Sequence, residues 1–220
     1  MSATRLVAIR HGQTAWNAEW RLQGQTDIPL DALGRLQAGR LADALRHEGL
    51  VAVVSSDLAR ALDTAHALAG PLGLPVRVDT GLRERHFGML EGQVRGDIAR
   101  LWPDLARRWH AREPDFAPPG AETLIDFNQR CLAAVRRQAQ DHEGGAIAVV
   151  SHGGVLDCLY RAATGLTLDL PRTWPLGNAA IHRLLLTAQG LSLTGWNDTA
   201  HLLGLVDPAG QARPAGGAQT

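Results

Sequence analysis

Two histidine–glycine loops are the first candidates for a reactive site in this sequence. His11 lies in Arg-His-Gly (10–12) directly after the apolar run 6–9, and His152 lies in Ser-His-Gly-Gly (151–154) directly after the apolar run 146–150. If both runs are parallel strands of one sheet, both histidines stand at its carboxyl edge, where open α/β folds bind ligands. The two imidazoles, 141 positions apart, would then face one pocket. The alternative is a pair of unrelated buried histidines.

Several small and polar residues accompany these two loops. Thr14 and Asn17 follow the first histidine and can donate hydrogen bonds to a ligand. Gly12 and Gly153 lack a side chain, so the backbone can approach a ligand closely there. All four are therefore candidate binding residues.

Arg60 is the candidate cation of a third segment, which follows the apolar run 51–54. The spacing of Leu and Ala after it predicts a helix, with Ser56 or Asp57 as its N-cap. An arginine in the first helical turn adds its charge to a helix end that already favours anions. The competing interpretation is a solvated arginine paired with Asp57 or Asp63.

A fourth segment, 82–92, supplies two candidate carboxylates. Glu84 stands between Arg83 and Arg85, which is also the pattern of an ordinary surface ion pair. Glu91 precedes a glycine and is the weaker candidate, because a glutamate in that position is usually a turn residue. We therefore expect Glu84 to be the acid or base of the site, if the site needs one.

The basic residues are 22 arginines and no lysine, balanced by 22 acidic residues. The missing lysine excludes a Walker A phosphate loop, a protein-kinase site and a Schiff-base lysine. The zero net charge argues against a nucleic-acid partner and against a polybasic membrane surface. An anionic ligand would have to be bound by arginine and histidine, and the guanidinium fork suits phosphate.

The elements that must position these residues alternate along the chain of 220 residues. Apolar runs at 6–9, 51–54, 75–78, 146–150, 179–186 and 191–196 predict strands, and helical spacing is found over 32–48, after 57, after 123 and over 155–163. This alternation predicts an α/β three-layer sandwich with a mostly parallel sheet flanked by helices. We expect one domain over 1–205, with a helical insertion near 92–120 that caps the substrate, and a flexible tail over 206–220.

Taken together, the motifs resemble the histidine phosphatase superfamily, which includes the cofactor-dependent phosphoglycerate mutases. R-H-G-x-T-x-x-N (10–17), S-D-L-x-R-A-x-x-T-A (56–65), E-x-x-F-G-x-x-E-G (84–92) and S-H-G-G (151–154) occur in the family's order. Gln23-Gly24 and the segment 196–202 are also similar to family segments. The resemblance covers about residues 5–203.

The resemblance implies a covalent phosphohistidine mechanism. His11 would be the nucleophile, and Glu84 would protonate the leaving oxygen and then activate water. The phosphoryl oxygens would be held by Arg10, Arg60 and His152. The surrounding binding residues would be Gly12, Thr14, Asn17, Gln23, Gly24 and Gly153. No metal would be needed, and none of the histidines has a metal-site spacing.

Phosphatases and mutases of this family share such a site and differ in what caps it. Glu84-Arg85-His86-Phe87-Gly88 is close to the mutases' E-R-H-Y-G, but the stretch up to His152 is shorter and has no lysine-bearing segment. Trp102, Trp109 and Phe116 stand there instead, which favours a bulkier or less charged substrate. The expected function is thus hydrolysis of a small phosphorylated metabolite without a cofactor. A mutase using 2,3-bisphosphoglycerate, and an inactive binding protein, are the alternatives.

Two cysteines without C-x-x-C spacing and the short N-terminal apolar run predict a cytoplasmic protein. No stretch is apolar enough for a membrane span. The sequence leaves the oligomeric state open, a homodimer included.

Overall fold

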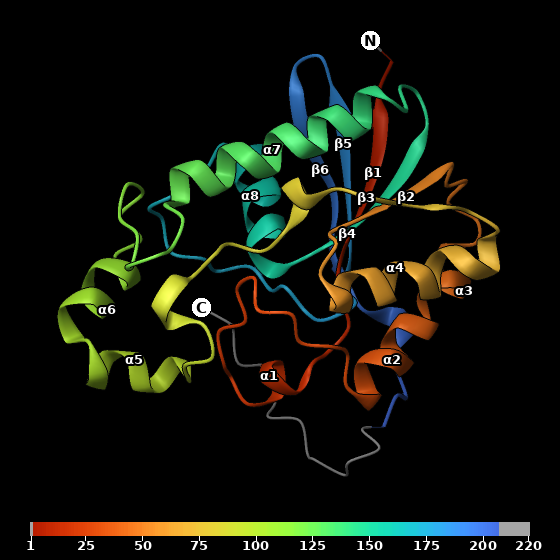
Figure 1. Ribbon diagram of the computed structural model, residues 1–220. Helices are drawn as coiled ribbons and strands as arrows, with labels where there is room; N and C mark the ends of the chain where they lie inside the picture. Colours follow the sequence, from red (N-terminus) through yellow and green to blue (C-terminus); the bar gives the residue numbers. More distant parts are fainter. Residues whose placement is uncertain (1, 207–220) are drawn as a thin grey trace.

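A computed structural model describes residues 2–206 and contains one mixed sheet of six strands (Figure 1). The strands are β1 (Thr4–Arg10), β2 (Ala52–Ser55), β3 (Val76–Val78), β4 (Ala146–Ser151), β5 (Ile181–Thr187) and β6 (Gly190–Asp198). They lie in the order β3-β2-β4-β1-β5-β6. The four strands β3, β2, β4 and β1 are parallel, whereas β5 and β6 are antiparallel to their neighbours. The α/β prediction is confirmed.

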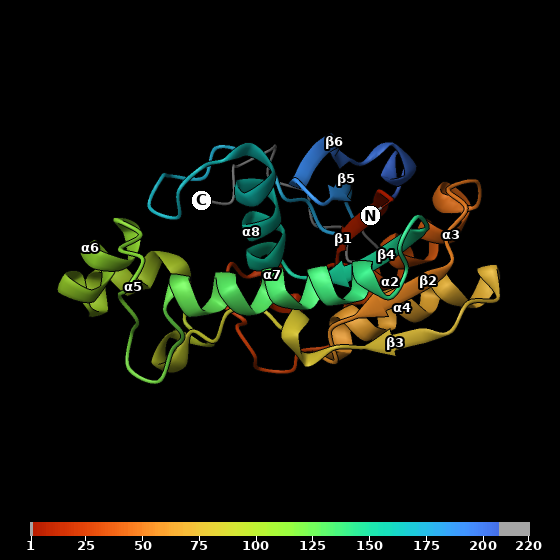
Figure 2. The ribbon, with the colours of Figure 1, turned by 90° about the horizontal axis from the view of Figure 1, so that it is seen from above.

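Helices cover both faces of the sheet, because successive strand residues point to opposite sides. Along β1, Leu6 and Ala8 pack towards α7 (Leu124–Gln140) and α8 (Gly153–Thr164). Val7 and Ile9 pack towards α3 (Leu41–Leu45) and α4 (Ala59–Leu72). Figures 1 and 2 show these two helical layers with the sheet between them. The short α1 (Ala15–Ala18) and the helix α2 (Ala32–Gly39) follow the first loop.

The segment 92–120 forms a small helical unit of its own. It contains α5 (Arg95–Leu101) and α6 (Pro103–His110), which stand apart from the sheet in Figure 1. Ile98 and Ala106 pack there against Leu22 and Leu90, so the unit has a separate apolar cluster. Trp102 is part of this cluster and does not reach the cavity described below.

Two local expectations differ from the structure. The helix expected over 32–48 is interrupted at Arg40, whose N–H bonds the Gln37 carbonyl at 3.2 Å, as in a tight turn. Neither Ser56 nor Asp57 caps α4, since the Asp27 carboxylate accepts the N–H of Ala59 at 2.8 Å. The tail expected over 206–220 lies, apart from its first residue, outside the described residues.

No helix within residues 2–206 is long and apolar enough to cross a membrane.

Candidate active site

The two histidine loops meet because β1 and β4 are parallel neighbours. Arg10 and Ser151 are register partners, and the N–H of His11 bonds the Ser151 carbonyl at 2.9 Å. The imidazole rings of His11 and His152 have centroids 5.2 Å apart and are both buried. The structure therefore places the two histidines side by side at the carboxyl edge of the sheet.

His11 is held as a neutral imidazole with one defined tautomer. Its Nδ1 lies 2.7 Å from the carbonyl oxygen of Gly12, which can only accept, so Nδ1 carries the proton and Nε2 has a free lone pair. Burial, together with the charges of Arg60 and Arg10, lowers the pKa of His11 well below its usual value, and the bond to Gly12 opposes this only in part. Nε2 is thus available as a nucleophile at neutral pH.

Gly12 allows this arrangement because there is no room for a side chain. A Cβ at position 12 would lie 2.4 Å from the carbonyl oxygen of Gly34. The backbone N–H of Gly12 donates to Thr64 Oγ1 at 3.0 Å. The loop after β1 therefore packs directly against the start of α2.

His152 has the opposite tautomer. Arg60 Nε, a donor, lies 3.2 Å from His152 Nδ1, so the proton of His152 is on Nε2. Within residues 2–206 that buried N–H has no hydrogen-bond acceptor. Burial and the charge of Arg60 lower the pKa of His152 well below its usual value. A buried donor without a partner costs about 1–3 kcal/mol, which an anionic ligand beside His11 would recover.

Arg60 is fully buried and pairs with neither Asp57 nor Asp63. Besides His152, it donates to the carbonyls of Thr26 at 2.9 Å and Gly24 at 2.7 Å. Burial lowers the pKa of Arg60 to about 10, which leaves it protonated at neutral pH. Its charge therefore faces the histidine pair, and it also holds the 24–26 loop.

Glu84 is held by two backbone N–H groups rather than by the arginines beside it. One carboxylate oxygen accepts from Arg85 N at 2.8 Å and the other from Gly154 N at 3.0 Å. Arg83 instead pairs with Asp57 at 2.8 Å. A Cβ at Gly154 would lie 2.2 Å from Glu84, so the carboxylate reaches this place only because position 154 is glycine. The surface ion pair that the sequence left open is absent from residues 2–206.

Glu91, the weaker candidate, is a clamp for the 24–26 loop. Its carboxylate accepts the N–H groups of Gln25, Thr26 and Phe87, each at 3.0 Å, and the Thr26 hydroxyl at 2.6 Å. Burial alone would raise the pKa of Glu91, but these bonds outweigh it and the pKa is lowered. Gly24, at φ +55°, lies so close that a Cβ would be 2.0 Å from the carboxylate.

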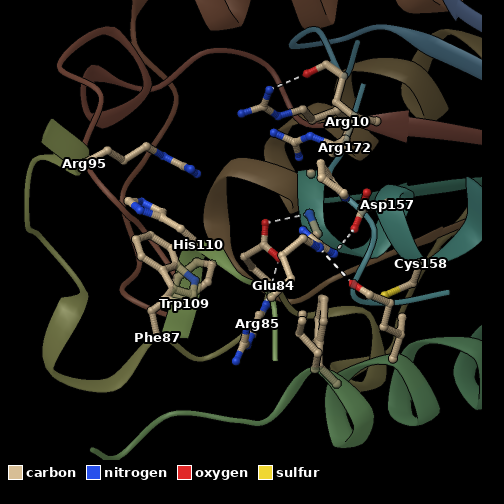
Figure 3. A pocket seen from close by; sticks show the side chains of 18 of the residues that line it. Arg10, Glu84, Arg85, Phe87, Arg95, Trp109, His110, Asp157, Cys158 and Arg172 are labelled. Carbon is tan, nitrogen blue, oxygen red and sulfur yellow. Dashed lines mark hydrogen bonds and ion pairs between the residues drawn. The ribbon is translucent and has the colours of Figure 1, made fainter. Parts of the chain in front are cut away.

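Two cavities that share lining residues open over these residues, and Figure 3 shows the larger of them. The smaller, about 50 Å³, is bordered by His11 and Arg60, and the larger, about 650 Å³, by Trp109. Both are lined by Arg10, Glu84, Phe87 and Arg95.

The remaining predicted binding residues divide between these cavities and the scaffold. Asn17, Gln23 and Gly24 border the small cavity, and Gly153 borders the large one. Thr14 is fully buried, and its hydroxyl caps α1 by accepting the N–H of Asn17 at 3.2 Å. Thr14 therefore orients Asn17 and lines neither cavity.

Sequence reasoning missed several residues of the site. Arg95, Arg172 and Arg112 all line the large cavity, yet they lie in segments without regular spacing. Asn178 was also missed, and its amide donates to the His11 carbonyl at 3.1 Å and to Asn17 at 3.2 Å. Only a contact between segments far apart in the chain identifies such residues.

The expectation for the aromatic residues of the insertion was partly wrong. Trp109 lines the large cavity, whereas Phe116 packs under the guanidinium of Arg108 at 4.1 Å. Five arginines and two carboxylates line the large cavity, so its walls are strongly charged. The arginines are Arg10, Arg85, Arg95, Arg112 and Arg172.

Comparison with known proteins identifies the class to which this fold and site belong. The family model of the histidine phosphatase superfamily (branch 1) matches residues 6–199. The chain therefore belongs to the histidine phosphatase superfamily, as the motifs predicted, and it is a phosphoryl-transfer enzyme of that type.

Individual relatives include phosphatases and mutase-like proteins. The chain is 35% identical over 201 residues to phosphoglycerate mutase-like protein 4 of Arabidopsis thaliana, covering 90% of this chain and 86% of the relative. It is 35% identical over 202 residues to a metal-independent phosphoserine phosphatase of the same plant, covering 90% and 83%. A mycobacterial glucosyl-3-phosphoglycerate phosphatase in complex with VO3 has a similar structure, with a TM-score of 0.77, 35% identity and coverage of 89% and 99%.

Proposed function

We propose that this protein hydrolyses the phosphomonoester of a small metabolite through a phosphohistidine on His11. The observation that carries the proposal is the tautomer of His11, whose Nε2 lone pair is free beside a cavity bordered by Arg10 and Arg60. The activities of the two phosphatase relatives, one of which is metal-independent, support hydrolysis without a metal.

In the first step, Nε2 of His11 attacks phosphorus and the bond to the ester oxygen breaks. Glu84, which borders both cavities, gives its proton to the leaving oxygen, and an alcohol departs. Arg10, Arg60 and the N–H of His152 stabilise the charge on the three remaining oxygens. In the second step, Glu84 takes a proton from water as the water attacks phosphorus. The bond to Nε2 breaks, and inorganic phosphate and free His11 result.

The positive charge of this site comes from the chain's own arginines, and the N–H of His152 adds a hydrogen-bond donor, so we propose that no metal or organic cofactor takes part. Among residues 2–206, no three His, Cys, Asp or Glu side chains are grouped as a metal site would require. The insertion 92–120 would cap the substrate and select it. The two cysteines are free thiols, which suits a reducing compartment such as the cytoplasm.

The test is the detection of a phosphoenzyme. Purified protein is mixed with 32P-labelled phosphomonoester in EDTA and quenched, and the label should be acid-labile and base-stable, as phosphohistidine is. His11→Ala should abolish the label, whereas His142→Ala, whose imidazole bonds the Gln138 carbonyl away from the site, should retain it. Turnover by the His11→Ala protein would refute the proposal. Phosphate release from 3-phosphoglycerate, with and without 2,3-bisphosphoglycerate, separates a phosphatase from a mutase.

A further inference from the structure

Arg172 differs from the other arginines of the large cavity in that no side chain or carbonyl of the described part of the chain holds its guanidinium by a hydrogen bond, although the charges of Asp157 and Glu84 act on it. It is half-buried in the loop between α8 and β5, and among residues 2–206 it makes no hydrogen bond or ion pair. Arg85 donates to the carbonyls of Glu122 and Phe116, and Arg112 donates to Asp157 at 2.9 Å. Those two guanidiniums are held by the protein, whereas that of Arg172 is directed into the cavity (Figure 3).

Arg172 is also close to two other cations. Arg10 at the end of β1 and Arg95 at the start of α5 line the same cavity, and Figure 3 shows the three guanidiniums converging on it from opposite sides. Burial and then the charge of Arg172 lower the pKa of Arg10 to about 9 and that of Arg95 to about 10. Like charges gathered in a partly desolvated cavity favour the binding of an anion.

The arginines are distributed unequally over the two cavities, and Arg10 and Arg95 border both. Arg10 and Arg60 border the small cavity beside His11, where the phosphoryl group would react, and Arg172 borders only the large one. We propose that Arg172, with Arg95, binds a second anionic group on the alcohol part of the substrate. The natural substrate is then a phosphate ester whose alcohol carries a carboxylate or a second phosphate. This inference rests on the proposed function, because the first phosphate is assigned to the His11 site.

The volume and lining of the large cavity are consistent with this assignment. At about 650 Å³ it is much larger than the phosphoryl site, and it lies in the range typical of small-ligand pockets. Phe87 and Trp109 form an aromatic wall with ring centroids 6.2 Å apart, which an apolar or ring-shaped part of the alcohol can contact. The planar guanidinium of Arg172 can bind a carboxylate or phosphate with two parallel hydrogen bonds.

Two matched substrate pairs test the inference. 3-Phosphoglycerate differs from glycerol 3-phosphate by a carboxylate, and fructose 1,6-bisphosphate differs from fructose 6-phosphate by a second phosphate. The wild-type protein should have the higher kcat/KM for the member with the additional anionic group in at least one pair. The pair that shows this preference identifies that group as a carboxylate or a phosphate. Arg172→Gln should reduce that preference about 10- to 100-fold, mainly through KM, because charge-assisted hydrogen bonds are lost. Arg172→Lys should restore only part of it.

Arg136→Gln is the matched control, because it removes one arginine from the exposed face of α7, which does not border the cavity. It should leave the preference unchanged. Equal kcat/KM values within both pairs, or an unchanged preference in the Arg172→Gln protein, would overturn the inference while hydrolysis itself stands.

Calorimetry with the His11→Ala protein measures binding without turnover. The same four compounds should bind with the same preference, and the additional substitution Arg172→Gln should remove it. If none of the four is hydrolysed by the wild-type protein but this preference is found, the proposed function fails and the anion site stands. If the His11→Ala protein binds both members of each pair equally, the anion site fails.

Discussion

Replacing Glu84 by glutamine tests both its position and its proposed chemistry. The two carboxylate oxygens each accept one backbone N–H, from Arg85 at 2.8 Å and from Gly154 at 3.0 Å. Glutamine offers one accepting oxygen and one NH2 group, so one of the two N–H groups would face a donor. We expect Glu84→Gln to lower the free energy of unfolding by about 1–3 kcal/mol, the cost of one buried unsatisfied donor.

The effect on rate depends on the leaving group. An alkyl alcohol leaves poorly as an alkoxide, whereas nitrophenolate leaves well without a proton. General acid catalysis is worth roughly 10²–10⁴-fold, so Glu84→Gln should slow phosphohistidine formation from an alkyl phosphate by about that factor and from 4-nitrophenyl phosphate by less than about tenfold. Glu84→Asp keeps both oxygens and the proton but withdraws them by one methylene, so it should show the same ranking with smaller losses.

Rapid-quench measurement of the phosphoenzyme with both substrates separates the chemistry from the later hydrolysis. Urea unfolding of the same variants gives the stability change. Glu113→Gln, which removes a carboxylate paired with Arg108 on the surface of the insertion, is the control and should change neither rate. Equal slowing of both substrates would refute the proton-donor role. Glu84 would then only position the site, and His86 would become the next donor to test, since the carboxylate oxygens of Glu91 already hold the 24–26 loop.

Three further outcomes are expected. Because burial and neighbouring arginines lower the pKa of His11 and His152, both stay neutral in the folded protein as the pH falls through 6.5, and kcat/KM should show no inflection caused by His11 near that value. The unfolded chain takes up those protons below pH 6.5 and the folded protein does not, so stability should fall with falling pH. The slope should be about 1.4 kcal/mol per pH unit for each histidine, and urea titrations in which His11→Ala retains the full slope would contradict this. Gly154→Ala should displace Glu84, whose oxygen would lie 2.2 Å from the new Cβ, and reproduce the alkyl-selective loss of Glu84→Gln; wild-type rates on alkyl phosphates would count against that geometry. Vanadate should inhibit and EDTA should not, and loss of activity in EDTA that a divalent ion restores would disprove metal independence.

The parts of the site that the sequence predicted are those in which short-range pattern determines position. The runs 6–9 and 146–150 predicted strands from local pattern, and the structure adds that β1 and β4 are parallel neighbours, which brings His11 and His152 together. The direction of β5 and β6 does not follow, because an apolar run has the same composition in either direction. The single helix expected over 32–48 failed at Arg40 for a similar reason, since helical spacing continues across a tight turn.

The side-chain positions that the sequence could not predict lie in segments without a regular hydrophobic period. Trp102 and Trp109 are similar in type and close in sequence, and both pack against the apolar cluster of the insertion, yet Trp109 also lines the cavity and Trp102 does not. Their different places depend on how α5 and α6 turn relative to one another. Arg172 lies in an irregular loop, where neither spacing nor composition indicates which way a side chain points.

The wall of the large cavity is built where the insertion meets the loop between α8 and β5. Arg112 follows α6 and joins the two, donating to Asp157 of α8 at 2.9 Å and to the Leu168 carbonyl at 2.8 Å. Arg161 bonds the same carboxylate at 3.0 Å and donates to the Leu170 carbonyl at 2.8 Å. The loop that carries Arg172 is therefore fixed by two arginines that share one aspartate. The chemical step is assigned to loops of the sheet edge, whereas the walls that would select the alcohol belong to the insertion and this loop. The two parts meet at Arg10, Glu84, Phe87 and Arg95, which line both cavities, so a change at any of these four would alter the reacting site and the alcohol site together.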